Sequence, residues 1–350
     1  MILTRLSRYF PALLFCLLMS TQAPGTPTAF AMRTKAISLS ACSNGSLSIS
    51  THITPNKVGK MTKYLVPSGG AWGITAGPDG NVWFTEQYAQ NIGSITPHGH
   101  ETIYPLPNRY SYPYAITSGS DGNLWFTEEA SQIGRITPQG QITEFTLPGN
   151  NSGLAITAGP DGNIWFTQSS NIGRITPQGD ITEFPLPDSD YRYGITTGLD
   201  GNLWFTSLEG NTIGRITPQG QVTEFPIPTP NSQPIGITAG PDGNLWFTQD
   251  NYNEIGRMTP GGQITEFLLA KSTEPPLFIA AGPDGNLWFT ESVRCGGSGD
   301  SIVRITPKGV TKMFPIPYNY PVGITAGPQH RMWFAGFGDF SGVIGKITTR

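Results

Sequence analysis

The chain has 350 residues and a formal net charge of −3, and only 13% of its residues are charged. It contains no dense run of Lys and Arg, so the basic surface typical of a nucleic-acid-binding protein is missing and nucleic acid is excluded as a partner. The 44 glycines and 31 prolines favour many short strands joined by tight turns over helices.

Residues 1–31 have the three parts of a secretory signal peptide. Arg5 and Arg8 precede an apolar run from Phe10 to Met19, and Ala29-Phe30-Ala31 forms an A-x-A cleavage site. The apolar run is too short to remain as a membrane span. We therefore expect a secreted, extracellular protein.

Residues 32–59 are rich in Ser, Thr and Asn, and we expect a flexible leader. Cys42 follows Leu39-Ser40-Ala41 as in a bacterial lipoprotein box, but no long apolar stretch directly precedes it, so lipid anchoring is the less favoured alternative. Cys42 and Cys295 are the two cysteines of the mature chain. An oxidising compartment would allow them to pair, yet their spacing does not favour a disulfide over two free thiols.

From about residue 60 onward the chain is one repeat array. A Trp-Phe pair recurs seven times at spacings of 42, 40, 39, 42, 42 and 45 residues, at Trp83, Trp125, Trp165, Trp204, Trp246, Trp288 and Trp333. Self-similarity at a period of this length is typical of propellers and solenoids. The sequence thus predicts one repeat domain over residues 60–350.

Each unit contains four short strand patterns. In the third unit these are strand A (154–159), strand B (164–168), strand C (172–176) and strand D (181–186), with Pro160-Asp-Gly-Asn163 and Pro177-Gln-Gly179 as turns. Proline at the second position and glycine where φ is positive are typical of hairpin turns. We therefore predict an all-β, seven-bladed propeller with four-stranded blades. An open solenoid is the alternative, but it needs distinct capping repeats, and the sequence has none.

The two ends of the array predict how the ring closes. The seventh unit stops at its third strand, Ile344–Thr348, whereas Lys60–Pro67, ahead of the first unit, matches the fourth-strand pattern of Gln141–Pro148. We expect the segment 60–67 to complete the last blade, because closure removes exposed sheet edges.

Two sets of recurring residues are best explained by structure. The Trp-Phe pair lies in a continuous apolar run, which is typical of a strand buried on both faces between blades. The Arg of Ile-Gly-Arg on strand C and the Glu of Thr-Glu-Phe on strand D recur together, and we expect them to pair across the strands at the rim.

Function is expected on the face that carries the variable loops, which we call the top face. It contains the connections between strands B and C and from strand D to the next strand A. Seven residues just before the Gly-Ile or Ala-Ile of strand A form a predicted ring there: Trp72, Tyr114, Leu154, Tyr193, Ile235, Leu277 and Val322. We predict a ligand-binding site for a small molecule or peptide from Trp72, Tyr114, Tyr193, Leu277 and Val322.

A second ring follows strand B, three residues after each Trp. It includes Glu86, Glu128 and Glu291, which fall on blades 1, 2 and 6. Such an acidic arc is able to bind Mg²⁺ or Ca²⁺, which prefer oxygen ligands, or to attract a cationic group. In the plainer alternative, the glutamates accept hydrogen bonds from neighbouring loops or face water.

Histidine argues against acid–base catalysis on this face. His52 lies in the leader, His98 and His100 lie at a turn between strands C and D, and His330 lies at a turn between strands A and B. No nucleophile elbow, phosphate-binding glycine loop or zinc-binding helix motif occurs in the sequence.

The repeated Gly-Ile-Thr-Ala-Gly-Pro-Asp-Gly-Asn-Leu-Trp-Phe-Thr-Glu, Ile-Gly-Arg-Ile-Thr and Ile-Thr-Glu-Phe-Pro-Leu-Pro closely resemble the streptogramin B lyases (virginiamycin B lyase family) over residues 60–350. The resemblance implies a seven-bladed propeller that opens cyclic depsipeptides at an ester linkage by elimination, with Mg²⁺. In that family two His and two Glu of the last two blades are catalytic. The two His positions fall on Leu277 and Val322 of this chain, and the two Glu positions fall on Tyr320 and Phe337.

Two hypotheses follow. The first is a secreted, monomeric propeller that binds a small molecule or peptide on its top face and has lost the catalytic residues. The second is a metal-dependent carbon–oxygen lyase that uses Glu86, Glu128 or Glu291 around Mg²⁺, with Glu291 as the candidate catalytic residue. We favour the first. Propellers carry many unrelated functions, so the residues of the site decide the function and the fold does not.

Overall fold

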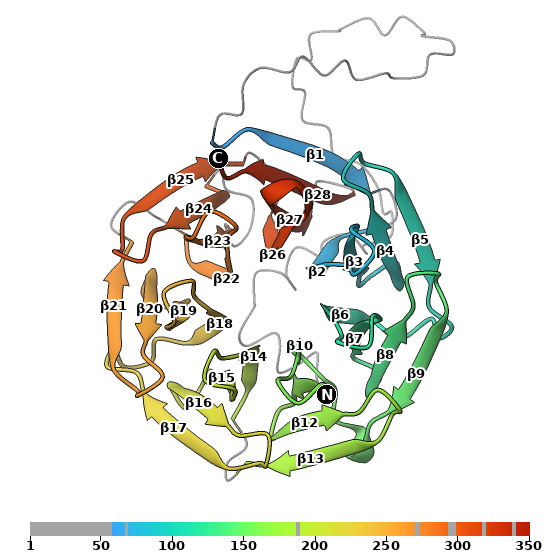
Figure 1. The fold of residues 1–350 in the computed structure, drawn as a ribbon, viewed down its shortest axis with the longest axis horizontal. Coiled ribbons are helices and arrows are strands. Elements are labelled where there is room, and N and C mark those ends of the chain that lie inside the picture. The colour runs from blue at the N-terminus through green and yellow to red at the C-terminus, as the bar shows by residue number, and fades with distance from the viewer. Residues whose placement is uncertain are drawn as a thin grey trace, which may run out of the picture. The chain divides into compact units, whose positions relative to one another are not determined.

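The computed structural model describes residues 58–66, 69–186, 190–269, 274–292, 299–316, 320–337 and 341–350. They form seven four-stranded antiparallel sheets arranged in a ring as the blades of a propeller (Figure 1). Residues from all seven blades line a cavity on the axis of the ring, which we call the channel. The predicted fold is confirmed. Helical structure within the described ranges is limited to two 3-10 turns, η1 (Pro148–Asn150) and η2 (Pro328–His330). No helix in these ranges is long and apolar enough to cross a membrane.

Several predicted features lie outside the described residues. These are the signal peptide, the leader up to residue 57, Cys42 and Cys295.

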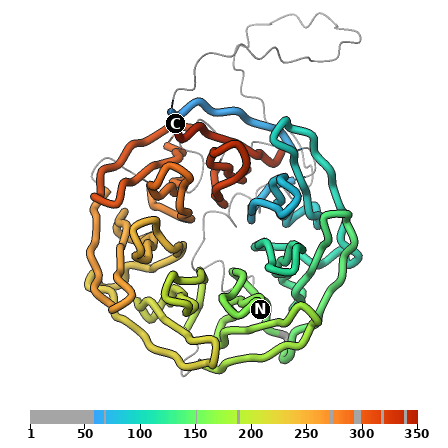
Figure 2. Tube along the Cα trace, in the orientation of Figure 1, coloured from blue at the N-terminus to red at the C-terminus, as the bar shows by residue number. Residues whose placement is uncertain are grey.

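The blades follow one another along the chain, each with its strands in the order A, B, C, D from the channel outward (Figure 2). Blade 1 is β2 (Ala71–Ala76), β3 (Val82–Glu86), β4 (Asn91–Ile95) and β5 (Glu101–Pro105). Blade 2 is β6 (Pro113–Ser118), β7 (Leu124–Glu128), β8 (Gln132–Ile136) and β9 (Ile142–Thr146). Blade 3 is β10 (Ile156–Ala158), β11 (Ile164–Thr167), β12 (Asn171–Ile175) and β13 (Ile181–Pro185).

The remaining blades have the same layout. Blade 4 is β14 (Arg192–Thr197), β15 (Leu203–Ser207), β16 (Thr212–Ile216) and β17 (Val222–Pro226). Blade 5 is β18 (Pro234–Ala239), β19 (Leu245–Gln249), β20 (Glu254–Met258) and β21 (Ile264–Leu268). Blade 6 is β22 (Pro276–Ala281), β23 (Leu287–Glu291), β24 (Ser301–Ile305) and β25 (Thr311–Pro315). Blade 7 is β26 (Pro321–Gly327), β27 (Arg331–Phe337), β28 (Gly342–Thr348) and β1 (Met61–Val66).

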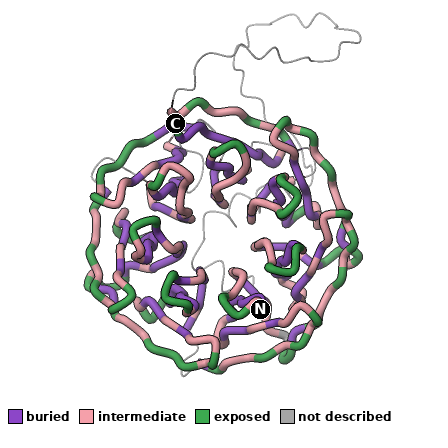
Figure 3. Tube along the Cα trace, in the orientation of Figure 1, coloured by how far each residue is buried: buried purple, intermediate pink, exposed green. Residues whose placement is uncertain are grey.

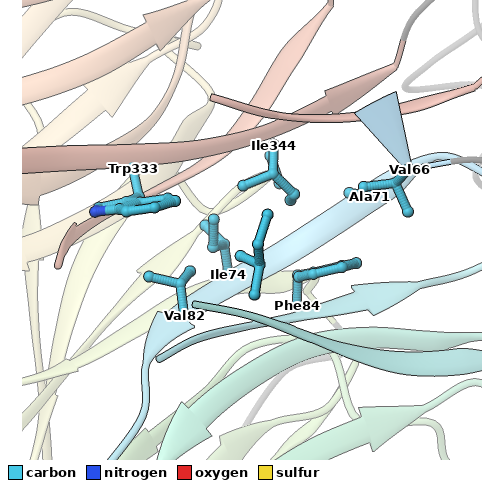
Figure 4. Close-up of a cluster of buried hydrophobic side chains, with 9 residues drawn as sticks. Val66, Ala71, Ile74, Val82, Phe84, Trp333 and Ile344 are labelled. Carbon is cyan, nitrogen blue, oxygen red and sulfur yellow. The ribbon is translucent and has the colours of Figure 1, made fainter. Parts of the chain in front are cut away.

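Ring closure by the N-terminal strand is confirmed. β1 pairs antiparallel with β28, and Tyr64 lies opposite Ile344. Val66 of β1 also joins a buried cluster with Ala71 and Phe84 of blade 1 and Ile344 of blade 7 (Figure 4). The two ends of the array therefore share both backbone hydrogen bonds and an apolar core.

The recurring tryptophans fill the spaces between blades. All seven are fully buried, at 0% exposure, as the continuous apolar runs predict. Burial is concentrated in the inner strands, whereas the outermost strands are largely half-buried or exposed (Figure 3).

The turn between strands A and B caps each of these tryptophans in the first six blades. In blade 3, Trp165 Nε1 donates to Asp161 Oδ1 at 3.0 Å, and the Asn163 side chain donates to Asp161 Oδ2 at 2.8 Å. Burial alone would raise the pKa of Asp161, but the hydrogen bonds from Asn163 and Trp165 outweigh it and hold that pKa below its usual value. The Pro-Asp-Gly-Asn motif thus satisfies a buried indole as well as reversing the chain.

The predicted Arg–Glu pairing between strands C and D is wrong. Arg174 lies opposite Thr182, whereas Glu183 lies opposite Gly173, so the two charges occupy opposite faces of the blade. The Arg174 guanidinium instead stacks over Trp165 and Phe184, at 5.6 and 5.5 Å from the ring centroids. The recurring arginine therefore covers the aromatic core of its blade.

Candidate functional site

The top end of the channel is built from the first residues of each strand A. In six of the seven blades the pairing of strands A and B shifts register there, between Ala71 and Ile74 in blade 1 for example. The Thr of Trp-Phe-Thr then anchors the next blade: Thr85 Oγ1 donates to the Tyr114 carbonyl at 2.7 Å while accepting from Gly73 N at 2.9 Å. The same bond joins blades 2, 4, 5 and 6 to the next blade, whereas blade 7 has Ala335 in place of the threonine.

Aromatic side chains from several blades meet at this mouth. The Trp72 and Tyr114 rings lie 5.0 Å apart, Tyr114 and Tyr193 lie 6.5 Å apart, and Tyr193 and Phe278 lie 6.2 Å apart. The hydroxyls of Tyr114 and Tyr193 form a hydrogen bond. Blades 2, 4 and 6 are not neighbours in the ring, so these contacts cross the channel. We call Trp72, Tyr114, Tyr193 and Phe278 the aromatic mouth.

A cavity of about 190 Å³ adjoins the aromatic mouth inside the channel. Its walls are the four rings of the aromatic mouth and one isoleucine from strand A of every blade, from Ile74 of β2 to Ile324 of β26. Burial raises the pKa of the Tyr114 and Tyr193 hydroxyls above their usual range, so both are neutral.

The predicted ligand-binding ring is brought together only in part. Trp72, Tyr114 and Tyr193 line the cavity, whereas Leu277 and Val322 are not among its lining residues. The sequence reasoning missed Phe278, which occupies the place held by Gly or Ala in the other six units. A single aromatic residue at a position that is otherwise Gly or Ala was the signal that the sequence offered.

A second missed feature extends the aromatic mouth outward. Phe337 of β27 lies 5.6 Å from Trp72 and 6.3 Å from Tyr88, which is 44% exposed. The rings therefore form a continuous path from solvent at Tyr88, through Phe337 and Trp72, to the channel.

The three glutamates of the predicted acidic arc lie at the ends of β3, β7 and β23, and all three are buried. Glu86 accepts a hydrogen bond from Asn91 Nδ2 of its own blade at 3.0 Å. Burial raises the pKa of Glu128 to about 7; the Glu144 carboxylate adds to this shift and Ser111 opposes it. All three side chains therefore lie in the protein interior and do not face water.

These glutamates do not fit a Mg²⁺ site. A metal ion of this kind takes several oxygen ligands around one point. Nowhere in the described part of the chain do three His, Cys, Asp or Glu side chains form a group that could hold a metal ion. The role of Glu291 in catalysis stays a prediction.

Blade 4 differs from the other blades at the same level. Its strand A begins with Arg192, which is 0% exposed, opposite Ser207, where blades 5 and 6 have Pro opposite Gln or Glu. Arg192 lies 3.9 Å from the Asp190 carboxylate and 3.4 Å from that of Glu224. Asp190 also accepts hydrogen bonds from the Ser207 hydroxyl and from Gly210 N. Blade 4 thus has Ser207 where blades 5 and 6 have a buried Gln or Glu, and its buried charge is an arginine paired with carboxylates.

The family comparison covers most of the chain. The sequence model of the Virginiamycin B lyase family matches residues 50–193 and 192–350. A curated virginiamycin B lyase from Saccharopolyspora erythraea is 49% identical over 82 residues, which are 23% of this chain and 27% of the length of that relative.

Solved structures extend the similarity to the whole propeller. A virginiamycin B lyase from Staphylococcus aureus, with 42% identity and a TM-score of 0.75, aligns with 83% of this chain and 99% of its own. A catalytically inactive histidine-to-alanine form of the S. aureus enzyme, solved with quinupristin, has 42% identity and a TM-score of 0.76, over 83% of this chain and 99% of its own. A streptogramin B lyase has 35% identity and a TM-score of 0.76, over 83% of this chain and 98% of its own.

Proposed function

Because the chain belongs to the Virginiamycin B lyase family, we propose that it is a ligand-binding propeller that holds a small molecule or peptide over its channel mouth without cleaving it. The observation that carries this proposal is the aromatic mouth with its extension through Phe337 to Tyr88. Aromatic rings supply large apolar contact area, and rings joined across blades need little ordering on binding.

The residues at the family's catalytic positions support binding without cleavage. Leu277 and Val322 have no titratable side chain, and Phe337 packs against Trp72. The Tyr320 backbone N–H donates to Asp300 at 3.0 Å. None of the four supplies an imidazole or carboxylate, so the general base and acid that an elimination needs are missing from these positions.

Quinupristin is the first ligand to test, because a catalytically inactive family member was solved with it. In isothermal titration calorimetry we expect residues 32–350 to bind quinupristin and Trp72→Ala to weaken binding by about tenfold or more, as for a central aromatic contact. Phe145→Ala, a rim aromatic stacked on Trp125, is the matched control for loss of a ring away from the mouth.

The same complex decides between binding and catalysis. With Mg²⁺ present, tandem mass spectrometry after chromatographic separation distinguishes cyclic from linear quinupristin, because elimination opens the ring without changing the mass. We expect only the cyclic form. A linear product that disappears with Glu291→Ala would establish the alternative, a carbon–oxygen lyase.

Export as a monomer is part of the proposal. Export is supported by the signal-like segment at residues 1–31, with its Ala29-Phe30-Ala31 cleavage site. Mass spectrometry of protein from the culture medium should find an N-terminus at Met32, and light scattering should give the mass of one chain. Protein retained in the cells with residues 1–31 attached would contradict export.

A further inference from the structure

The channel cavity defines the chemistry of what it would hold. We propose that it binds one uncharged, ring-sized apolar group that carries a single hydrogen-bond acceptor. This inference rests on the proposed function and names the class of ligand group that the aromatic mouth would admit.

The volume of the cavity limits the size of the group that it can hold. The cavity of about 190 Å³ exceeds the roughly 150 Å³ of an engineered apolar cavity that stays dry and binds benzene. It is well below the roughly 300–1,000 Å³ of pockets that enclose a drug-sized ligand. A cyclic peptide would therefore remain above the mouth and insert a single ring-sized substituent.

The cavity wall carries no charged side chain. The lining includes no Asp, Glu, Lys, Arg or His, and its two hydroxyl groups are the neutral Tyr114 and Tyr193. Moving an ion from water into such surroundings is costly unless an opposite charge pairs with it. The cavity thus selects against carboxylates and ammonium groups.

The indole N–H of Trp72 is a hydrogen-bond donor at the cavity wall. Trp72 Nε1 is buried beside the Tyr114 hydroxyl, yet it forms no hydrogen bond of normal geometry with any described residue. A buried donor without a partner is costly, so a ligand acceptor placed there restores a hydrogen bond as well as filling space. A carbonyl or ether oxygen on the inserted group meets this requirement.

Phe278 sets the width of the cavity. The equivalent residues in the other blades are Gly73, Ala115, Ala155, Gly194, Gly236 and Gly323. The Phe278 ring contacts Tyr193 across the channel and occupies space that seven small residues would leave open. The single aromatic substitution narrows the channel to a chamber for one ring.

Three probes of similar size test the acceptor and the charge separately. Acetophenone has a ring and an acceptor, ethylbenzene has the ring alone, and benzoate is charged. We expect saturable binding of acetophenone and of ethylbenzene by NMR titration, and none of benzoate at the same concentrations. Trp72→Phe keeps an aromatic ring but removes the N–H. It should weaken acetophenone by about fivefold, the value of one hydrogen bond, and leave ethylbenzene unchanged.

A filling variant tests the location. Ile156→Phe adds volume at the cavity wall and should abolish binding of both neutral probes, whereas Ile156→Val should retain it. Benzoate binding as tight as acetophenone binding, or no effect of Ile156→Phe in a folded variant, would overturn the inference. If quinupristin binds and neither neutral probe does, the chamber is refuted while the proposed function stands. If the neutral probes bind and quinupristin does not, the chamber is supported while the proposed function is contradicted.

Discussion

Tyr64 of β1 stacks on Trp333 of β27 with ring centroids 6.2 Å apart and an angle of 12° between the planes. In blade 1 the strand-D residue Tyr104 stacks on Trp83 in the same way, at 5.3 Å and 12°. Lys346 lies over both rings of the closing pair, 5.1 Å from each centroid, where blades 2 to 6 have arginine and blade 1 has Ser94. The N-terminal strand therefore reproduces the full aromatic core of a blade as well as its hydrogen bonds.

Removing this ring should weaken closure. We expect Tyr64→Ala to lower the free energy of unfolding by about 2 kcal/mol, because it removes a half-buried aromatic contact. Urea denaturation followed by tryptophan fluorescence measures the change, and Tyr64→Phe is the control that keeps the stack. Deletion of residues 60–67 should cost far more than deletion of residues 32–52, because it removes β1 entirely. Equal stability of Tyr64→Ala and Tyr64→Phe would refute a role of the stack in closure.

Glu128 should make stability depend on pH. Burial raises its pKa to about 7, whereas an unfolded glutamate titrates near 4.5. As pH rises, the unfolded chain releases this proton before the folded protein does. The contribution of Glu128 to the free energy of unfolding is therefore fully present below pH 4.5, and about 3 kcal/mol of it is lost as the pH rises to 7.

Glu128→Gln should therefore remove this decline and make the protein more stable than wild type at pH 8. Chemical denaturation between pH 4 and 8 measures the slope. Glu86→Gln is the matched control at the same position of blade 1, where Asn91 donates to the carboxylate. An unchanged slope in Glu128→Gln would show that another group causes any pH dependence.

The buried network of blade 4 should be more sensitive than the rim. Arg192→Ala should lower the free energy of unfolding by about 3 kcal/mol, because it removes the cation from beside the buried Asp190 carboxylate. Arg174→Ala, at the partly exposed rim, should cost about 1 kcal/mol from its lost stacking on Trp165. Thermal unfolding of the two variants provides the comparison, and a larger loss for Arg174→Ala would contradict it.

The hydroxyls that meet across the channel should be energetically coupled. Tyr114→Phe and Tyr193→Phe each remove one side of the same hydrogen bond. In a double-mutant cycle on the free energy of unfolding we expect a coupling of about 1 kcal/mol. Additive losses would mean that the two hydroxyls act independently.

Much of the architecture follows from local sequence. The Pro-Asp-Gly-Asn turns, the four strand patterns and the spacing of the tryptophans predict the blades because each depends on residues close together in the chain. Ring closure was also predictable, since the strand missing at the end of the array has its match at residues 60–67.

The candidate site was less predictable because its contacts are not local. Tyr114, Tyr193 and Phe278 belong to blades that are not neighbours, and no spacing in the sequence indicates which side chains meet in the channel. The same holds for Arg174, whose place over Trp165 depends on which face of the strand it occupies once the register is set.

By itself, then, the sequence determined the repeat, the four-stranded unit, the buried tryptophans and the closing strand, because turn geometry and strand alternation act within one unit. Only the tertiary structure decided that Glu128 is buried, that Arg192 is paired with Asp190, and that four rings from four blades line one cavity. These features arise where different blades meet, and the distances between blades are set by the packing of the whole ring.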